Sequence, residues 1–230
     1  SDPLIPKLIH QIWLGPKQIP NKYKKWIKSW LKYNPTWDYI FWDENKIKEL
    51  NLNEYDINSQ NINPGFRSDI VRYVVLKKYG GLYIDTDFEC VKSIPNELLK
   101  YEFVSCTIFG NKPVIANGMI MSIPNHILLD KILNYLKKVK YKNDIEYILL
   151  NSGPERLTKE YFKNFKEVQK KSLILPSNYF YPFPNFLIRK KININEEIED
   201  QTIGIHHWEM SWMKDKLLKR IKRKITNFLK

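Results

Sequence analysis

The stretch FRSDIVRYVVLKKYGGLYIDTDFE, from Phe66 to Glu89, decides the fold of this 230-residue chain. Apolar residues in its first half lie on more than one side of a helix, which predicts a helix that is well buried. Gly80 and Gly81 then supply a left-handed stop, a conformation that a Cβ atom resists. The apolar residues 82–84 predict a short buried strand that runs inward from this stop.

Two aspartates, Asp85 and Asp87, follow the predicted strand directly. In an extended backbone, residues two apart point to the same side, so we expect both carboxylates to face one way and Thr86 the other. Paired carboxylates suit a hard divalent cation whose other ligands are waters and substrate phosphates. A D-x-D string alone is more typical of a solvated loop. The helix, glycines and strand that lead into this one favour the metal site.

The whole stretch resembles the S-D-I-x-R-Y…Y-G-G-x-Y-x-D-x-D signature of GT-A glycosyltransferases. The resemblance is to the family 32 group, which includes capsular-polysaccharide sugar transferases and shares its core with the clostridial glucosylating toxins. It implies an α/β GT-A fold, with a Rossmann-like central mixed sheet flanked by helices. It also implies a divalent cation, Mn²⁺ or alternatively Mg²⁺, and a UDP-sugar or GDP-sugar as the donor.

The amino-acid composition excludes some classes of protein. Hydrophobic residues at 43% and aromatic residues at 14% exclude a disordered chain and predict one domain with a substantial core. No apolar run reaches the length of a bilayer-spanning helix, and no signal-peptide pattern opens the sequence. Cys90 and Cys106 lack CxxC spacing and are expected to be buried thiols. We therefore expect a cytoplasmic protein.

The formal net charge of +13 favours anionic partners such as nucleic acid, acidic membranes or phosphorylated substrates. Much of it is concentrated in residues 214–230, which hold eight Lys and Arg against one Asp around an apolar stripe. We expect a catalytic domain over 1–213 and a basic amphipathic helix over 214–230. Such a helix suits the anionic inner face of a membrane, although it could instead pack on its own domain.

The N-terminal part of the chain reads as strand, helix, strand. Leu8–Leu14 predicts a first strand, Asn21–Tyr33 a helix whose aromatic stripe belongs to the core, and Trp37–Trp42 a second strand. This pattern is typical of open α/β sheets, in which ligands bind at the carboxyl ends of strands.

The motif I-H-x-x-W-x-G at residues 9–15 resembles the beginning of family 32 chains. The resemblance implies that Trp13 stacks on the nucleotide base and that the backbone from Gln11 to Leu14 lines its edge. A tryptophan at the end of a strand is, however, more often a core residue.

The same resemblance assigns donor contacts within the central stretch. It implies that Asp69 accepts hydrogen bonds from sugar hydroxyls, that Arg72 bridges a hydroxyl and a phosphate, and that Tyr83 contacts the ribose or diphosphate. The alternatives are an ordinary ion pair three residues apart on a helix, and a tyrosine in the strand core.

Three later segments also resemble family elements. Asn117, in a strand candidate over Val114–Ile123, matches an amide that lies beside the anomeric carbon or the acceptor. Ser152–Pro154 matches an element close to the acceptor pocket, and Pro154 opens a helix. The aromatic loop Pro176–Phe186 is our candidate for the wall of that pocket. A generic turn, a plain helix start and a packed loop are the respective alternatives.

The segment IHHWEMSW, residues 205–212, resembles the closing H-H-W-x-x-S-W motif of the family. Neutral imidazole is a suitable Mn²⁺ ligand beside carboxylates. The resemblance therefore implies a histidine ligand, for which we expect His207 in preference to His206, with Ser211 and Trp212 at the phosphates. A histidine pair can also arise from packing alone.

These features predict a metal-dependent hexosyltransferase that acts on a sugar hydroxyl of a glycan or glycolipid. Asp87 is expected to bind the cation directly and Asp85 through water or at the ribose. By resemblance the reaction retains the anomeric configuration. The alternatives are a toxin-like transferase that modifies host proteins and a metal-dependent phosphodiester hydrolase. A nucleic-acid-binding protein is disfavoured because no nucleic-acid motif is present.

Overall fold

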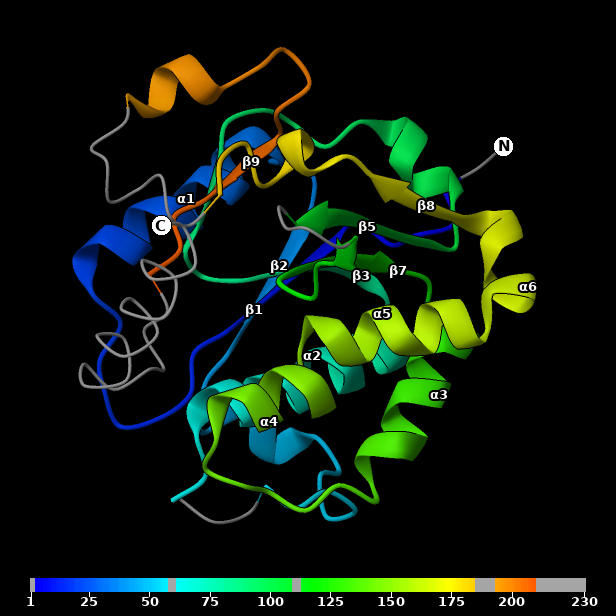
Figure 1. The fold of residues 1–230 in the computed structure, drawn as a ribbon. Coiled ribbons are helices and arrows are strands. Elements are labelled where there is room, and N and C mark those ends of the chain that lie inside the picture. The colour runs from blue at the N-terminus through cyan, green and yellow to red at the C-terminus, as the bar shows by residue number, and fades with distance from the viewer. Residues whose placement is uncertain (1–2, 58–60, 109–112, 185–192, 210–230) are drawn as a thin grey trace, which may run out of the picture.

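The computed structural model describes residues 3–57, 61–108, 113–184 and 193–209 of the chain. In this part, seven strands form a central sheet and two more form a small sheet beside it (Figure 1). The central strands are β1 Leu8–Ile12, β2 Asp38–Trp42, β3 Gly81–Ile84, β5 Phe103–Ile108, β6 Val114–Ile115, β7 Met119–Ser122 and β8 Ser172–Leu175. The small sheet pairs β4 Phe88–Cys90 with β9 Gly204–His206.

The helices are α1 Asn21–Tyr33, α2 Pro64–Tyr79, α3 Ile127–Leu136, α4 Ile145–Asn151, α5 Pro154–Lys163 and α6 Phe165–Val168. The central strands follow the order β2-β1-β3-β7-β5-β6, and β8 also pairs with β5. Strand β1 is parallel to β2 and β3, whereas β7 is antiparallel to β3 and β5. The expected mixed sheet flanked by helices is therefore confirmed.

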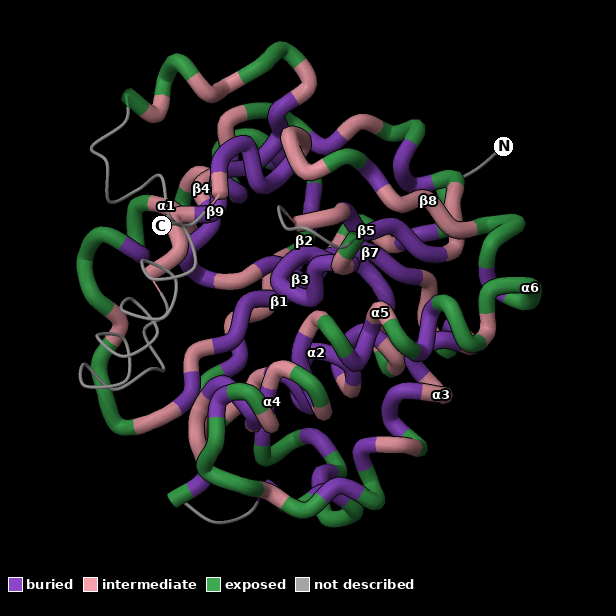
Figure 2. Tube along the Cα trace, viewed as in Figure 1, coloured by how far each residue is buried: buried purple, intermediate pink, exposed green. Residues whose placement is uncertain are grey.

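Two hydrophobic layers pack against the sheet, and Figure 2 shows buried positions along its strands. Helices α2 to α5 cover one side, on which Phe66 and Leu157 are fully buried. Helix α1 and the small sheet cover the other side, on which Trp30 and Phe88 are fully buried. Tyr23 and Trp30 of the α1 stripe are thus buried, as its spacing predicts, whereas Trp26 is half-buried and Leu31 is exposed.

The glycine stop after α2 is confirmed. Gly80 and Gly81 have φ angles of +65° and +93°, in the left-handed region that favours glycine. A Cβ on Gly80 would lie 2.7 Å from the ring of Pro124, and one on Gly81 would collide with the carbonyl oxygen of Leu8. The stop therefore lets β3 enter the sheet directly between β1 and β7.

The backbone of the Asp85–Asp87 segment differs from expectation. These residues form a turn between β3 and β4, closed by a 3.2 Å hydrogen bond from Phe88 N to Asp85 O, so the extended conformation predicted for them is wrong. The predicted strand Val114–Ile123 is likewise divided into β6 and β7 around residues 116–118. The two irregular segments meet where Asp85 N donates to Gly118 O at 2.9 Å.

Other expectations concern the whole chain. Both cysteines are buried free thiols, as predicted, and burial raises the pKa of Cys90 to about 12. In the described residues, no helix has the length and apolar character needed to cross a membrane. The predicted helix over 214–230 lies outside these residues, so the division of the chain at residue 213 stays a prediction.

His10, in β1, joins the glycine stop to strand β2. Its ring is fully buried, Nδ1 accepts a hydrogen bond from the indole Nε1 of Trp42 at 3.1 Å, and Nε2 lies 2.9 Å from Gly80 O. Because an indole N–H can only donate, Nδ1 must be unprotonated and Nε2 carries the proton. Burial lowers the pKa of His10 from 6.5 to about 4, although the bond to Gly80 opposes this shift.

We predict that His10 makes the fold acid-sensitive. Between pH 6.5 and pH 4 the unfolded chain binds a proton at this position that the folded chain does not, so stability present at neutral pH is lost as the pH falls. Between pH 7 and pH 4.5 the wild type should lose about 2 kcal/mol more unfolding free energy than His10→Gln. Urea unfolding of both proteins at the two pH values measures this difference. Equal losses would contradict the prediction.

Candidate active site

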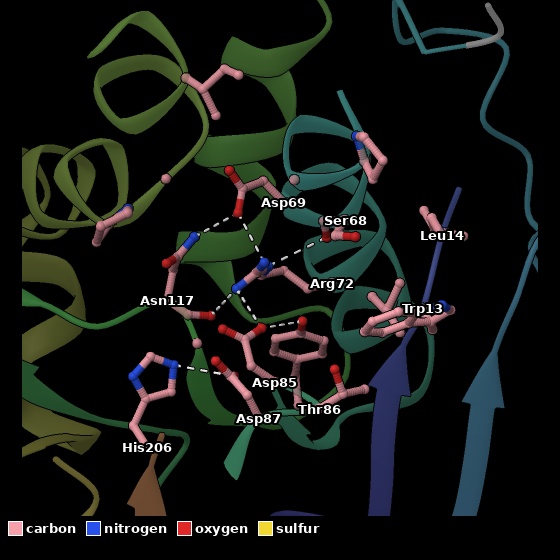
Figure 3. A pocket seen from close by; sticks show the side chains of 18 of the residues that line it. Trp13, Leu14, Ser68, Asp69, Arg72, Asp85, Thr86, Asp87, Asn117 and His206 are labelled. Carbon is pink, nitrogen blue, oxygen red and sulfur yellow. Dashed lines mark hydrogen bonds and ion pairs between the residues drawn. The ribbon is translucent and has the colours of Figure 1, made fainter. Parts of the chain in front are cut away.

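A cavity of about 450 Å³ opens at the carboxyl ends of β1 and β3. Its lining comes from the segment after β1, the first turns of α2, the turn after β3, residues 116–118, the α4–α5 junction and the residues around β9. Figure 3 shows that charged side chains from these separate elements converge on one another. The cavity thus lies where the sequence pattern predicts ligand binding in an open α/β sheet.

Asp85, Asp87 and His206 form a cluster that can hold a metal ion. One potential ligand atom from each lies within 4.8 Å of the others. His206 Nε2 is 3.2 Å from Asp87 Oδ1, and the backbone amide of Glu209 donates to Asp87 Oδ2 at 2.9 Å. Two carboxylates with an imidazole are a donor set that suits Mn²⁺. His206 Nδ1 is buried and has no hydrogen-bond partner in the described part of the chain.

The two aspartates differ in proton affinity although they sit in one turn. Burial raises the pKa of Asp85, and the charge of Asp87 adds to this effect while Arg72 opposes it. Burial also opposes ionisation of Asp87, but His206 and the amide of Glu209 outweigh it and lower its pKa. Asp87 is therefore the more firmly ionised carboxylate of the pair.

The structure places His206 beside these aspartates and His207 away from them. Side chains alternate between the two faces of a strand, and His206 is the last residue of β9. The His207 ring instead stacks on Trp26, with ring centroids 4.1 Å apart, and its Nε2 lies 2.9 Å from Glu89 Oε2. This geometry does not support the sequence-based preference for His207 as the metal ligand.

Arg72 lies at the centre of a network of charged and polar side chains in the cavity wall. Its guanidinium lies 3.0 Å from Asp69 Oδ1 and 3.3 Å from Asp85 Oδ1, and it donates to Asn117 O at 2.7 Å (Figure 3). Burial disfavours its charge, but Tyr83, Asp85 and Asp69 outweigh burial and raise the pKa of Arg72. The pair that the sequence places three apart on α2 is therefore buried in the cavity wall, not on the surface.

Asp69 receives hydrogen bonds from two further elements. Asn117 Nδ2 donates to its Oδ1 at 2.9 Å, and Ser152 Oγ donates to its Oδ2 at 2.7 Å. Burial raises the pKa of Asp69, whereas Arg72, Ser152 and Asn117 oppose the shift. Ser152 begins the Ser152–Pro154 element singled out in the sequence, and its residues Gly153 and Pro154 line the cavity.

Tyr83 and Gly118 constrain Asp85 from both sides. The Tyr83 hydroxyl donates to Asp85 Oδ1 at 2.5 Å, and the Arg72 guanidinium lies over the Tyr83 ring at 4.5 Å. A Cβ on Gly118 would come within 2.5 Å of Asp85 Oδ2 and 2.8 Å of the Tyr181 hydroxyl. Position 118 therefore requires glycine because the carboxylate occupies that space.

The segment after β1 lines the opposite end of the cavity. Trp13 and Leu14 both contribute to the lining, and Trp13 Nε1 donates to Lys17 O at 2.6 Å. Gln11 does not line the cavity, in contrast to the prediction. Its side chain is fully buried behind the lining, where Nε2 donates to the backbone oxygen of Asp85 at 3.3 Å and Oε1 accepts from the Tyr39 hydroxyl at 3.0 Å.

Sequence reasoning left some of the lining residues out of the candidate site. Tyr181 and Trp208 line the cavity beside His206. Tyr181 lies in the predicted aromatic wall 176–186, which is the signal that pointed to it, whereas Phe180 and Phe183 of the same segment are core residues. Trp208 lies in the closing motif. Ser211 and Trp212, predicted at the phosphates, lie outside the described residues.

Comparisons with known proteins point to one class of enzyme. Residues 20–104 match the family described as "Glycosyltransferase sugar-binding region containing DXD motif". The chain is 30% identical to an uncharacterized glycosyltransferase of Acanthamoeba polyphaga mimivirus, over 78% of the chain and 74% of that protein. It is also 30% identical to inositol phosphoceramide mannosyltransferase 3 of Schizosaccharomyces pombe, over 65% of the chain. The match spans 43% of that yeast protein.

Two solved structures share the fold. The PaToxG glycosyltransferase superimposes with a TM-score of 0.56 at 22% identity, over 73% of this chain and 72% of the other. The catalytic domain of the alpha-toxin from Clostridium novyi gives a TM-score of 0.51 at 12% identity, over 97% and 83%. The GT-A fold and the resemblance to the clostridial toxins are therefore confirmed.

We predict that Ser152 controls the proton affinity of Asp69. Ser152→Ala removes the hydroxyl that stabilises the carboxylate, so the pKa of Asp69 should rise further and the protein should lose about 1–2 kcal/mol of stability. Titration of the Asp69 carboxyl carbon by NMR measures the pKa.

Ser105→Ala is the matched control for this substitution. Ser105 is equally buried, but its hydroxyl donates only to the backbone oxygens of Ala116 and Met119. The control should lose similar stability and leave the pKa of Asp69 unchanged. An Asp69 titration that is the same in both variants would contradict the assigned hydrogen bond.

Proposed function

The chain belongs to the glycosyltransferase family whose sugar-binding region contains the DXD motif, and on this basis we propose which transfer it catalyses. The protein moves a hexose from a nucleoside-diphosphate sugar to a hydroxyl of a glycan or glycolipid, with a divalent cation and with retention of anomeric configuration. The observation that carries the proposal is the convergence of Asp85, Asp87 and His206 with the Arg72 network on one cavity.

Asp85, Asp87 and His206 are the residues that would hold the cation. The donor set fits, because oxygen and imidazole ligands suit Mn²⁺, and the low pKa of Asp87 keeps one carboxylate ionised. When bound, the cation neutralises negative charge that develops on the departing diphosphate. The remaining contributions come from the side chains of the chain itself.

Asp69, Arg72 and Asn117 form the part of the site that binds the donor sugar. Asp69 Oδ1 is engaged by both Asn117 and Arg72, whereas Oδ2 accepts a hydrogen bond from Ser152 and keeps a lone pair for a sugar hydroxyl. The permanent charge of Arg72 lies between Asp69 and Asp85, where it can stabilise a phosphate oxygen beside the sugar. Tyr83, bound to Asp85, extends this polar surface toward the ribose.

Trp13 and Leu14 form the end of the cavity that binds the nucleobase. The indole of Trp13 is held by its bond to Lys17 O and by an edge contact with Tyr23, whose ring centroid is 5.2 Å away. An indole fixed in this way presents a π-face next to a polar ligand, which suits a nucleobase. The indole face suits uracil and guanine alike, so both nucleotides belong in the test.

The acceptor side is formed by aromatic and apolar residues at the other end of the cavity. Tyr181 and Trp208 lie together, with ring centroids 5.3 Å apart, and Leu149 and Pro154 line the cavity across the α4–α5 junction. Aromatic faces suit sugar rings, and the apolar junction suits a lipid-linked acceptor. The yeast relative is named a mannosyltransferase of inositol phosphoceramide, so mannose and inositol-phosphate lipids are the first pair to test.

Retention of configuration follows from the family resemblance, and the engaged carboxylates support a route to it without a covalent glycosyl-enzyme. Each carboxylate that lines the described cavity is already engaged: Asp69 by Asn117 and Ser152, Asp85 by Tyr83, and Asp87 by His206 and Glu209. Front-face attack by the acceptor hydroxyl, assisted by the leaving phosphate, needs no free carboxylate nucleophile. Roles for Ser211 and Trp212, contact with an anionic membrane and a cytoplasmic location stay predictions.

We expect metal-dependent stabilisation by one nucleoside diphosphate. Thermal unfolding is measured with UDP, GDP and other nucleotides, each with and without Mn²⁺. Ligand at one hundred times its Kd should raise the Tm of a 230-residue protein by about 5–10 °C. The shift should require the metal and vanish in Asp87→Ala, because that substitution removes a cation ligand.

Asp38→Ala, which removes an exposed carboxylate at the start of β2, is the matched control and should keep the full shift. The nucleotide that stabilises the protein then defines the donor for transfer assays, which begin with GDP-mannose and UDP-glucose. In these assays Asp87→Ala should lower kcat/KM at least about a hundredfold. No metal-dependent shift with any nucleotide would refute the proposal.

A further inference from the structure

Trp208 has a backbone conformation that a large side chain disfavours. Its φ angle is +53°, and among the described residues only Asn125, at +54°, shares a positive φ without being glycine. Asparagine adopts the left-handed region readily, whereas a bulky residue there is a true outlier. Such strain persists only when the surrounding structure enforces it, and it clusters at functional sites.

The indole of Trp208 is fixed on several sides. Its Nε1 donates to the backbone oxygen of the buried Phe183 at 3.1 Å. Its ring lies edge-on to the ring of His206, with centroids 4.3 Å apart, and against Tyr181. The side chain therefore cannot leave this position without losing a hydrogen bond and two ring contacts.

The neighbours of Trp208 are fixed from the outside by helix α1. The His207 ring stacks on Trp26 with an angle of 10° between the planes, and Glu209 forms an ion pair with Lys22. Both contacts come from the first half of α1, which packs against β4. The segment 207–209 is thus held between α1 and the turn that contains Asp87.

The backbone amides on either side of Trp208 both bind Asp87. His207 N donates to the backbone oxygen of Asp87 at 2.9 Å, and Glu209 N donates to its Oδ2 at 2.9 Å. A left-handed residue turns neighbouring amides toward one concave side, as in the anion-binding arrangement called a nest. The unusual φ of Trp208 is what aims the second amide at the carboxylate.

We propose that Trp208 is a positioning residue for Asp87. Its packed indole enforces the left-handed backbone that keeps the Glu209 amide on Oδ2, which leaves Oδ1 beside His206 for the cation. This inference goes beyond the role of the ring as an acceptor wall, and its consequence for the metal rests on the proposed function. A purely space-filling tryptophan would not influence the Glu209 amide.

Two variants distinguish the effect of the backbone conformation at position 208 from the effect of the indole ring. Trp208→Ala and Trp208→Gly both remove the indole, but only glycine enters the left-handed region without a steric penalty. Hydrogen exchange of the Glu209 amide in the metal-free protein reports its bond to Asp87. Binding of Mn²⁺ alone, followed through the electron paramagnetic resonance of the free ion, reports the consequence for the cluster.

We expect a defined order of effects. Protection of the Glu209 amide and Mn²⁺ affinity should both decrease from wild type through Trp208→Gly to Trp208→Ala, with Ala about fivefold below Gly, the factor that corresponds to a left-handed penalty of about 1 kcal/mol. Trp208→Phe keeps an aromatic ring at this position but loses the bond to Phe183 O and part of the ring area, so it should remain closest to wild type.

Asn125→Ala and Asn125→Gly are the matched controls. Asn125 has almost the same φ but precedes α3, and its amide donates to Lys77 O. Its two variants should differ in Tm, as an Ala–Gly pair in the left-handed region must, without changing the Glu209 amide or Mn²⁺ binding. This shows that general destabilisation does not produce the Trp208 result.

The outcomes distinguish the two proposals. Equal protection of the Glu209 amide in Trp208→Ala and Trp208→Gly overturns the positioning role, whatever the protein does with metal. The expected order of protection with unchanged Mn²⁺ affinity overturns the link from the amide to the cation site. If the variants show the expected order of protection but the wild-type protein does not bind Mn²⁺, the metal part of the proposed function is refuted while the backbone role of Trp208 stands.

Discussion

The rest of the site depends on the ion pairs and the hydrogen bond that the buried guanidinium of Arg72 makes. It joins α2 to the turn after β3 and to the break between β6 and β7, three elements that are distant in sequence. A buried ion pair adds little to stability compared with apolar residues of the same volume, because desolvation of both partners is costly. The arrangement is therefore better explained by the need for a fixed charge in the cavity than by folding.

Irregular backbone segments position the polar groups that surround the Arg72 guanidinium. The glycine stop carries β3 into the middle of the sheet, the turn at Asp85–Asp87 ends it, and the interruption at residues 116–118 brings Asn117 and Gly118 against it. Regular strands would point their side chains alternately up and down. Breaks in the strands instead direct several polar groups into one space, at the edge of the sheet where ligands bind.

Contacts on two sides hold the cluster of Asp85, Asp87 and His206 in place. On the inner side, Arg72 and Tyr83 hold Asp85. On the outer side, α1 holds the segment after β9, and that segment holds Asp87 through backbone amides. The pKa values of the two aspartates shift in opposite directions, because burial prevails at Asp85, whereas at Asp87 burial is outweighed by His206 and the amide of Glu209.

Residue type and short-range spacing were enough to predict most of the helices and strands, the glycine stop and the chemistry of the DXD stretch, because these features depend on local sequence. The tertiary structure decided how distant segments meet. It formed a turn at the aspartates where an extended strand was expected, set His206 and not His207 beside them, and buried the Gln11 side chain against Asp85 O, outside the cavity lining. It also joined Ser152 to Asp69, 83 residues apart. Such outcomes depend on strand register and on contacts between elements, which local patterns do not encode.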